Sequence, residues 1–236
     1  MISYADSATG THLDSGKEPG KFFRESTLKS ENVMPMPDVT NKMPKRSFLP
    51  RRISLKLQFS TLKLPQLNQI FRAKENSPMG KILARTIAQC ESAAIYGEKK
   101  SCVSSIKDTI DFATAILGHD VMVLSTTSTG GSKQQVMVGQ VKRMESSDTR
   151  KSVVCHQILF PSVIYYCHSF LDVEIYEINM LDRNSEVQIN RDVVICHFNT
   201  SAWSPNHPAF LDLRSSPGQT EACHWAYENN LVSIAI

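Results

Sequence analysis

The pattern of hydrophobic positions predicts two amphipathic helices in the first half of the chain. One begins after Ser77-Pro78, which supplies an N-cap followed by proline at the first helical position. The other begins between residues 101 and 105 and ends at Gly118, and its apolar residues recur at intervals of three and four. The expected apolar faces consist of Leu83, Ile87 and Cys90 in the first helix, and of Val103, Ile106, Ile110, Ala113 and Leu117 in the second.

After Gly118 the pattern is that of β-strands. Several stretches rich in β-branched and aromatic residues are separated by turn signals. These stretches are residues 121–128, 134–144, 152–160, 163–181, 186–198 and 231–236. Helices that precede a run of strands are typical of a segregated α+β fold rather than an alternating α/β fold. We therefore expect an N-terminal helical segment packed on a C-terminal antiparallel β region.

Composition divides the chain into a leader and one domain. Residues 1–21 are polar and aperiodic, which predicts a flexible leader, and residues 22–236 form the domain. The formal net charge of +3 is too small to indicate nucleic-acid binding. No apolar run reaches the length of a membrane-spanning helix, and the first 30 residues hold no apolar block of signal-peptide length.

A basic stretch lies among the prolines that follow the leader. It consists of Lys42, Lys45, Arg46, Arg51 and Arg52. A bipartite nuclear signal has a similar composition, but a charge run of this kind more often forms a solvated loop face. The solvated face is our interpretation of this segment.

Four of the six cysteines are each followed directly by a histidine, with gaps of 10, 27 and 25 residues between the pairs. Adjacent side chains of a strand point to opposite faces of its sheet. If the four strands neighbour one another, the cysteines gather on one face and the histidines on the other. The cysteines are Cys90, Cys102, Cys155, Cys167, Cys196 and Cys223, and the histidines after the last four are His156, His168, His197 and His224.

Three interpretations of this pattern stay open. The cysteines form disulfides and the histidines are only hydrogen-bonded, or the disulfides support a histidine copper site, since imidazole suits Cu(II). In the third, both residue types share a structural zinc ion, although the spacing differs from that of a zinc finger. We expect a local disulfide between Cys90 and Cys102, because Gly97 lets the chain turn back between the helices. The other four cysteines would then pair among themselves.

The fourfold Cys-His series resembles the signature of the BURP domain, a domain of plant proteins. The resemblance runs from Phe22 to the C-terminus. Other matching stretches are Phe22-Phe23, Phe48-Leu49-Pro50-Arg51, Gln89-Cys90-Glu91, Gly97-Glu98, Asp111-Phe112, Tyr165-Tyr166, residues 196–203 with His207, and Pro217-Gly218. The chain departs from the family at Ser233, where members usually carry a tryptophan, and Trp225 is a candidate substitute.

The resemblance implies one of two functions. Many BURP proteins are non-enzymatic proteins of seeds, cell walls and stress responses, and one relative is the non-catalytic β subunit of polygalacturonase. Others are copper-dependent peptide cyclases, which cross-link aromatic side chains of a core peptide in the same chain. The leader offers only Tyr4 as a cyclase substrate, without a repeat. We therefore expect a non-enzymatic role in seed development or stress response, similar to the seed- and embryo-associated subclass, with the cyclase as the alternative.

The resemblance also implies a site and a location. It makes His156, His168, His197 and His224 the metal ligands, with copper as the cofactor, and it assigns no catalytic residue. Members of the family belong to the apoplast, the cell wall or the vacuole, where cell-wall or vacuolar components would be the partners. Such compartments are oxidising, as stable disulfides require. His207 is interpreted as a turn residue, and alternatively as a residue that orients one of the four histidines.

Overall fold

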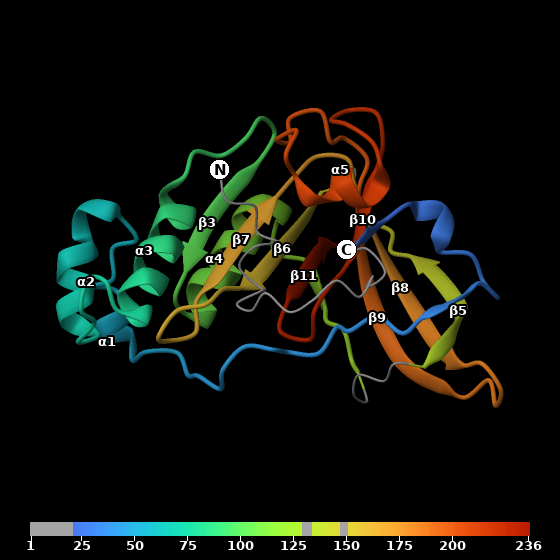
Figure 1. Ribbon diagram of the computed structural model, residues 1–236, viewed down its shortest axis with the longest axis horizontal. Helices are drawn as coiled ribbons and strands as arrows, with labels where there is room; N and C mark the ends of the chain where they lie inside the picture. The colour runs from blue at the N-terminus through green and yellow to red at the C-terminus, as the bar shows by residue number, and fades with distance from the viewer. Residues whose placement is uncertain (1–20, 129–133, 147–150) are drawn as a thin grey trace.

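The computed structural model describes residues 21–128, 134–146 and 151–236, and it has two antiparallel sheets with helices around them (Figure 1). This confirms the α+β class, with the first helices packed against a C-terminal β region. The leader predicted for residues 1–21 lies outside the described residues except for Lys21. Among the residues that are described, no helix has the length and apolar character needed to cross a membrane.

The first sheet has the strand order β1-β10-β9-β8-β5-β2, and the second has the order β3-β7-β6-β11-β4. All pairings are antiparallel. The strands of the first sheet are β1 (Phe22–Phe23), β2 (Val33–Pro35), β5 (Gln135–Arg143), β8 (Val173–Asp182), β9 (Gln188–His197) and β10 (Ala222–Trp225). Those of the second are β3 (Lys99–Val103), β4 (Val121–Leu124), β6 (Ser152–Gln157), β7 (Tyr165–Ser169) and β11 (Leu231–Ala235).

Helices lie mainly before the strands in sequence. They are the α-helices α1 (Arg51–Ser54), α2 (Leu64–Ile70), α3 (Pro78–Glu91), α4 (Ile106–Leu117) and α5 (Pro208–Leu213), with 3-10 turns η2 (Glu25–Thr27) and η3 (Thr61–Lys63). In Figure 1, α1, α2 and α3 lie together at one end of the long axis, and β5 lies at the other. Burial of apolar side chains, rather than intrinsic propensity, stabilises helices this short.

The two sheets share an apolar core between them. It contains Val154 and Val232 from the second sheet, and Val173, Val193 and Ile195 from the first. The other face of each sheet is also covered. Helix α4 packs on the second sheet, and the segment that carries Leu28 and Met36 packs on the first. Because both faces of each sheet are buried, side chains next to each other in a strand enter different cores.

The helix predicted after Ser77 is confirmed as α3, and the Ser77 side chain accepts a hydrogen bond from the Gly80 backbone N–H. The second predicted helix is confirmed as α4, but its expected apolar face is partly wrong. Val103 belongs to strand β3, and Ile106 and Ile110 are 63% and 55% exposed. The buried face of α4 is instead formed by Thr109, Ala113 and Leu117. A spacing of three and four residues fits more than one rotation of a helix, and the sheet beneath α4 selects one of them.

Candidate functional site

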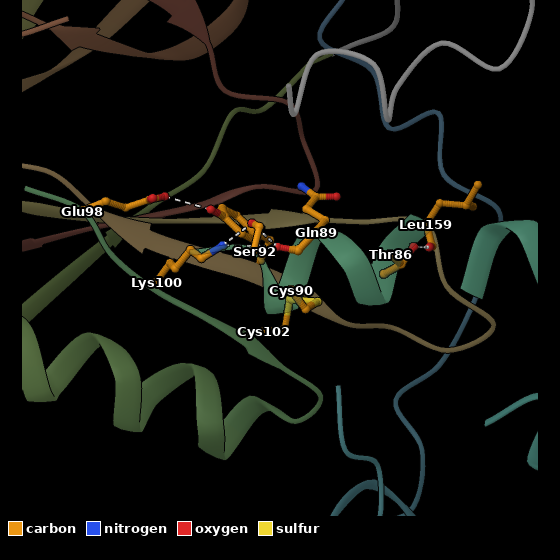
Figure 2. Close-up of a disulfide and its surroundings, with 9 residues drawn as sticks. Thr86, Gln89, Cys90, Ser92, Glu98, Lys100, Cys102 and Leu159 are labelled. Carbon is orange, nitrogen blue, oxygen red and sulfur yellow. Dashed lines mark hydrogen bonds between the residues drawn. A yellow bond between two sulfur atoms is a disulfide. The ribbon is translucent and has the colours of Figure 1, made fainter. Parts of the chain in front are cut away.

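All six cysteines lie in the described residues and form disulfides. Cys90–Cys102 joins the end of α3 to β3 and confirms the expected local bond, which Figure 2 shows beside Gln89, Ser92 and Lys100. The other two bonds are Cys155–Cys167 and Cys196–Cys223. The mixed zinc interpretation is therefore wrong for this structure, because no thiolate remains to bind a metal.

Each of the two later disulfides joins residues that stand directly opposite each other on neighbouring strands. Cys155 opposes Cys167 across β6 and β7, and Cys196 opposes Cys223 across β9 and β10. The four Cys-His strands are thus divided between the two sheets. The four strands therefore do not all neighbour one another, because strand pairing places β9 and β10 in the first sheet and β6 and β7 in the second.

The histidines follow from this register. Each histidine lies one residue beyond its cysteine, so it points to the opposite face of the sheet. Within a pair, the two histidines are diagonal neighbours, a relationship in which long side chains still meet. The Nε2 atoms of His156 and His168 are 3.2 Å apart, and those of His197 and His224 are 3.4 Å apart.

The two histidine pairs meet between the sheets. Val154 lies two residues before His156 and Ile195 two residues before His197, and both enter the core between the sheets. The ring centroids of His156 and His224, which come from different sheets, are 6.1 Å apart. We call His156, His168, His197 and His224 the histidine cluster. The structure therefore brings together all four histidines that the sequence singled out.

Aromatic side chains enclose the histidine cluster. Phe170 lies between His168 and His197, with ring centroids 5.0 and 5.5 Å away, and Trp203 lies 5.1 Å from His197. Phe22 packs against His224 at 5.8 Å. His156 and His197 are only 2% and 5% exposed. A bulky substrate therefore has no direct access to these two imidazoles.

Burial favours the neutral form of three of the four imidazoles. It is the largest cause that lowers the pKa of His156 and of His197 well below the usual range, and the neighbouring histidines lower both further. Burial also lowers the pKa of His224 to about 4. Neutral imidazoles keep a lone pair that can accept a hydrogen bond or bind a metal ion.

Two acceptors fix the orientation of one ring in each pair. His168 Nδ1 lies 3.3 Å from the Glu98 Oε1 atom, and His224 Nδ1 lies 3.2 Å from the Trp225 carbonyl oxygen. A carboxylate and a carbonyl can only accept, so both Nδ1 atoms donate, and in the neutral form of each ring the Nε2 atom carries the lone pair. In each pair the other histidine then donates its Nε2–H.

Glu98 is an acidic residue that contacts the histidine cluster through His168. Its Oε1 atom also accepts a hydrogen bond from the Tyr166 hydroxyl at 2.8 Å. Burial would raise the pKa of Glu98, but hydrogen bonds from His168, the Ile95 backbone and Tyr166 outweigh it and hold the pKa below its usual range. Pattern reasoning did not assign Glu98 a role, although Gly97-Glu98 was part of the family resemblance.

The histidine cluster fits a metal ion in some respects. Four nitrogens placed tetrahedrally at 2.0–2.1 Å from an ion are separated by about 3.3–3.4 Å, close to the two Nε2 separations. The Glu98–His168 contact is of the kind that orients metal-binding histidines. Within the described ranges, however, no three His, Cys, Asp or Glu side chains are already arranged as one coordination site. Metal binding therefore stays a prediction.

His207 lies near the cluster and forms a helix cap. Its Nδ1 atom accepts a hydrogen bond from the Ala209 backbone N–H, which makes it the N-cap of α5. Its ring packs on Trp203 at 4.4 Å and on Phe22 at 5.2 Å, and burial lowers its pKa to about 4. His207 is therefore a turn residue that caps α5. It packs on Phe22 and Trp203, two of the aromatic residues around the histidine cluster.

Ser233 and Trp225 occupy different cores. Ser233 is buried in β11, between Val123 and Val153 of the neighbouring strands. Trp225 belongs to β10 of the first sheet and packs on Phe23 at 5.0 Å. Trp225 therefore does not fill the position that the family's tryptophan would occupy, and its suggested substitution is wrong.

Comparison with known proteins identifies the family. Residues 21–235 match the BURP domain, and the chain belongs to this family. It is 51% identical over 214 residues to a polygalacturonase non-catalytic subunit of Solanum lycopersicum, covering 91% of this chain and 34% of that protein. It is 50% identical over 214 residues to a polygalacturonase 1 beta-like protein of Arabidopsis thaliana, with the same coverage.

A rice relative is covered more completely. BURP domain-containing protein 16 of Oryza sativa subsp. japonica is 40% identical over 235 residues, which are 99% of this chain and 67% of that protein. By contrast, the chain spans about a third of the length of the polygalacturonase-related proteins. The short leader suggested the seed- and embryo-associated subclass, whereas the domain itself is similar to these polygalacturonase subunits.

Proposed function

We propose that this chain is a non-catalytic protein domain of the plant cell wall that assembles with a polygalacturonase. The observation that carries the proposal is the identity of about half, over 91% of the chain, to proteins named as non-catalytic subunits of that enzyme. Three disulfides suit an oxidising location such as the cell wall. Cell-wall components are then the surroundings in which the domain acts.

The enclosed histidine cluster also supports a non-catalytic role. A general acid, base or nucleophile must come within hydrogen-bonding distance of its substrate. His156 and His197 are both buried, and Phe170 and Trp203 pack on His197. The Nε2 atoms of His156 and His197 are directed at other histidines. In a non-catalytic protein, the histidine cluster would join the two sheets and so hold the surface of the domain in a fixed shape.

The test is direct assembly with a plant polygalacturonase. Sedimentation velocity of the oxidised domain mixed with the enzyme should give one faster species that contains both proteins. The same domain after reduction and alkylation is the control, and it should not form this species because three disulfides are lost. If the oxidised domain and the enzyme sediment independently at concentrations well above micromolar, the proposed assembly is wrong.

A second candidate function rests on the facing Nε2 atoms of the histidine cluster, which would bind copper. When bound, copper would supply one-electron oxidation, the chemistry of the peptide-cyclase alternative. His156, His168, His197 and His224 would hold it, with Glu98 orienting His168. Trp203, whose ring packs on His197, is an aromatic side chain beside this site, whereas Tyr4 lies outside the described residues.

Copper titration followed by calorimetry and electron paramagnetic resonance tests the site. The wild-type chain and the His207→Ala variant should bind copper equally, since His207 lies outside the cluster. The double variant His156→Ala/His168→Ala should lose copper uptake while mass spectrometry still shows all three disulfides. Undiminished uptake in the double variant excludes this site. Intact mass of the copper-loaded chain in air then separates the functions, because each cross-link removes two hydrogen atoms.

A further inference from the structure

Positive charge is concentrated in one segment of the chain. Between Lys42 and Arg85 there are eleven Lys and Arg residues and a single acidic residue, Glu75, so this segment carries a net charge of +10. The rest of the chain has 26 minus 11, or 15, basic residues and 23 minus 1, or 22, acidic residues, a net charge of −7. The total of +3 therefore conceals two oppositely charged parts. We call residues 42–85 the basic lobe.

The basic lobe is a distinct end of the molecule. It contains α1, η3, α2 and the first half of α3, which lie together at one end of the long axis (Figure 1). Leu57, Leu67 and Leu83 of the lobe pack on Phe160 and Ile164 from the connection between β6 and β7. The charge excess is thus gathered in space as well as in sequence.

Polar contacts hold the lobe against the sheets. The Arg46 guanidinium donates hydrogen bonds to the carbonyl oxygens of Ile158 and Phe160, at 3.1 and 2.7 Å. Thr86, the residue directly after the lobe, donates its Oγ1 hydrogen to the Leu159 carbonyl at 2.6 Å, close to the Cys90–Cys102 bond at the end of α3 (Figure 2). The lobe therefore presents its charges from fixed backbone positions and not from a loose arm.

Most of the cations of the lobe have no anionic partner. Lys42 pairs with Asp38, and Arg51 lies 3.7 Å from Asp108. Arg46 donates its hydrogen bonds to the two carbonyl oxygens named above. The remaining eight are exposed and, within the ranges that the structure describes, make no ion pair: Lys45, Arg52, Lys56, Lys63, Arg72, Lys74, Lys81 and Arg85.

The arrangement carries an electrostatic cost. Lys81 and Arg85 are exposed four residues apart in α3, where like charges destabilise a helix. The other unpaired cations of the lobe also repel one another. Glu75 is the only acidic residue between residues 42 and 85 that could reduce this repulsion. An external polyanion would remove this repulsion and release its own condensed counterions.

We infer that the basic lobe binds a linear polycarboxylate, namely polygalacturonate, an inference that rests on the proposed function and names a partner for it. The eight unpaired cations lie in α1, η3 and α3, and in the segments before, between and after α1, η3 and α2. Such a distribution matches a chain with repeated charges better than one small anion, which needs converging donors. Arginine and lysine side chains both make charge-assisted hydrogen bonds to carboxylates.

Single-stranded nucleic acid fits the lobe less well than a polycarboxylate. Single-stranded nucleic acid is bound by stacking of bases on exposed aromatic rings. The aromatic residues of the lobe are Phe48, Phe59 and Phe71, all partly buried, and Phe59 and Phe71 pack on Phe160. An anionic membrane would use exposed apolar residues such as Leu55 and Leu62 as well as charge. Anionic lipid vesicles are therefore included in the test.

The charge of the remaining domain restricts where the polyanion can bind. The part outside the lobe has a net charge of −7 and repels a polycarboxylate at long range. Binding at the lobe would leave the other end of the molecule, where β5 lies, available to a polygalacturonase (Figure 1). The domain could then hold the enzyme and its substrate at separate surfaces.

The experiment compares two variants with the same change in net charge. The lobe variant is Lys74→Gln/Lys81→Gln/Arg85→Gln, and the control is Lys29→Gln/Lys99→Gln/Lys142→Gln, whose three lysines are exposed outside the lobe. Calorimetric titration with polygalacturonate at several salt concentrations should show about tenfold or more loss of affinity in the lobe variant only. Its salt dependence, the slope of log K against log salt, should also fall by about 2 to 3.

Three further measurements make the test decisive. Fully methyl-esterified pectin should not bind the wild-type chain, and the charge-preserving variant Lys74→Arg/Lys81→Arg/Arg85→Lys should bind polygalacturonate like the wild type. The inference is overturned if both neutralised variants lose affinity equally, or if the esterified polymer binds as well as the acid. Binding to anionic vesicles in preference to polygalacturonate also overturns it.

Sedimentation with polygalacturonase, without pectin, separates this inference from the proposed function. The lobe variant should still assemble with the enzyme as the wild type does. Failure of the wild-type chain to assemble, together with lobe-dependent binding of polygalacturonate, would remove the proposed assembly and retain the polyanion site. Assembly of the wild-type chain with the enzyme, without binding of polygalacturonate, would retain the proposed assembly and remove the polyanion site.

Discussion

Cys155 stands directly opposite Cys167 across β6 and β7, and this one pairing decides where two histidines lie. The residue after each cysteine points to the other face of the sheet, so His156 and His168 meet there with their Nε2 atoms 3.2 Å apart. A slip of one residue between β6 and β7 would place His156 and His168 on opposite faces of the sheet. The disulfide therefore fixes the geometry of the cluster as well as adding stability.

Removing this disulfide should have two separable effects. The Cys155→Ser/Cys167→Ser and Cys90→Ser/Cys102→Ser variants each open a bond with a sequence separation of 12. The chain-entropy estimate gives each the same loss, roughly 3 kcal/mol in the free energy of unfolding. Only the first variant should shift the histidine ring signals in NMR spectra. Equal shifts in both variants would show that the pairing does not control the cluster.

Glu98→Gln should weaken the contact with His168 that orients its ring. Because Glu98 is buried and its pKa lies below the usual range, its charge stabilises the fold above about pH 4.5 and this gain is lost as pH falls through the folded pKa. The variant should unfold about 1–3 kcal/mol more easily at neutral pH, with a smaller difference in acid. Chemical denaturation at several pH values measures this.

Tyr166→Phe is the matched control for Glu98→Gln. It removes the hydroxyl that donates to the same Glu98 oxygen but keeps the carboxylate beside His168. The control should lower stability while keeping the pH dependence that comes from the carboxylate. If Glu98→Gln and Tyr166→Phe change the pH dependence equally, the charge of Glu98 has no special effect on His168.

Local sequence patterns predicted the helices and the Cys90–Cys102 bond because the deciding interactions lie close in the chain. The Ser77 cap acts on Gly80, and the helix after it is stabilised by a periodic apolar face. The phase of the α4 face was not predictable, since Ile106 and Ile110 are as apolar as the residues that are buried. Only the sheet under α4 decides between them.

The sequence predicted which histidines form the cluster, but it did not predict how the strands bring them together. The repeated Cys-His order identified all four histidines, but it does not show which strands pair. Strand β6 pairs with the next strand, β7, but also with β11 at the end of the chain, and β9 pairs with β10 across α5. Packing between segments far apart in sequence decides the β6–β11 pairing and the approach of the two sheets. Glu98 escaped notice for the same reason, because it lies 70 residues before His168. A carboxylate without a local pattern gives no signal of its partner.

Asp192 should make the domain less stable as pH rises. It is fully buried in β9, neither carboxylate oxygen has a hydrogen-bond partner among the described residues, and burial, with the charge of Glu228, raises its pKa to about 7. The folded chain thus keeps a proton that the unfolded chain releases near pH 3.8. This contribution is complete below that pH and is lost as pH rises to about 7, at most about 4 kcal/mol.

Asp192→Asn tests this sign. The amide cannot ionise, so the variant should gain stability relative to the wild type as pH increases from 4 to 7. Urea denaturation at each pH gives the difference in the free energy of unfolding. A constant difference across this range would show that Asp192 does not titrate differently in the folded and unfolded chain.

The Tyr176 hydroxyl lies close to two carboxylates but has only one hydrogen to donate. Its oxygen lies 2.5 Å from Glu25 Oε1 and 2.7 Å from Glu174 Oε2, while Arg143 pairs with the other oxygen of Glu174 at 2.9 Å. The hydroxyl can donate to only one carboxylate, so the second contact brings two acceptor oxygens together without a hydrogen between them. Glu25→Gln supplies that hydrogen, because its amide can donate to the phenolic oxygen while Tyr176 donates to Glu174.

Glu25→Gln should therefore stabilise the segment that covers the first sheet, by about 0.5–1.5 kcal/mol at neutral pH. Tyr176→Phe should have the opposite effect, because it leaves the buried Glu174 without its hydroxyl partner. Glu25→Ala is the control, since it removes the carboxylate but supplies no donor. Thermal unfolding should rank the glutamine variant above the alanine variant. Equal stability of the two would show that no hydrogen is missing between Glu25 and Tyr176.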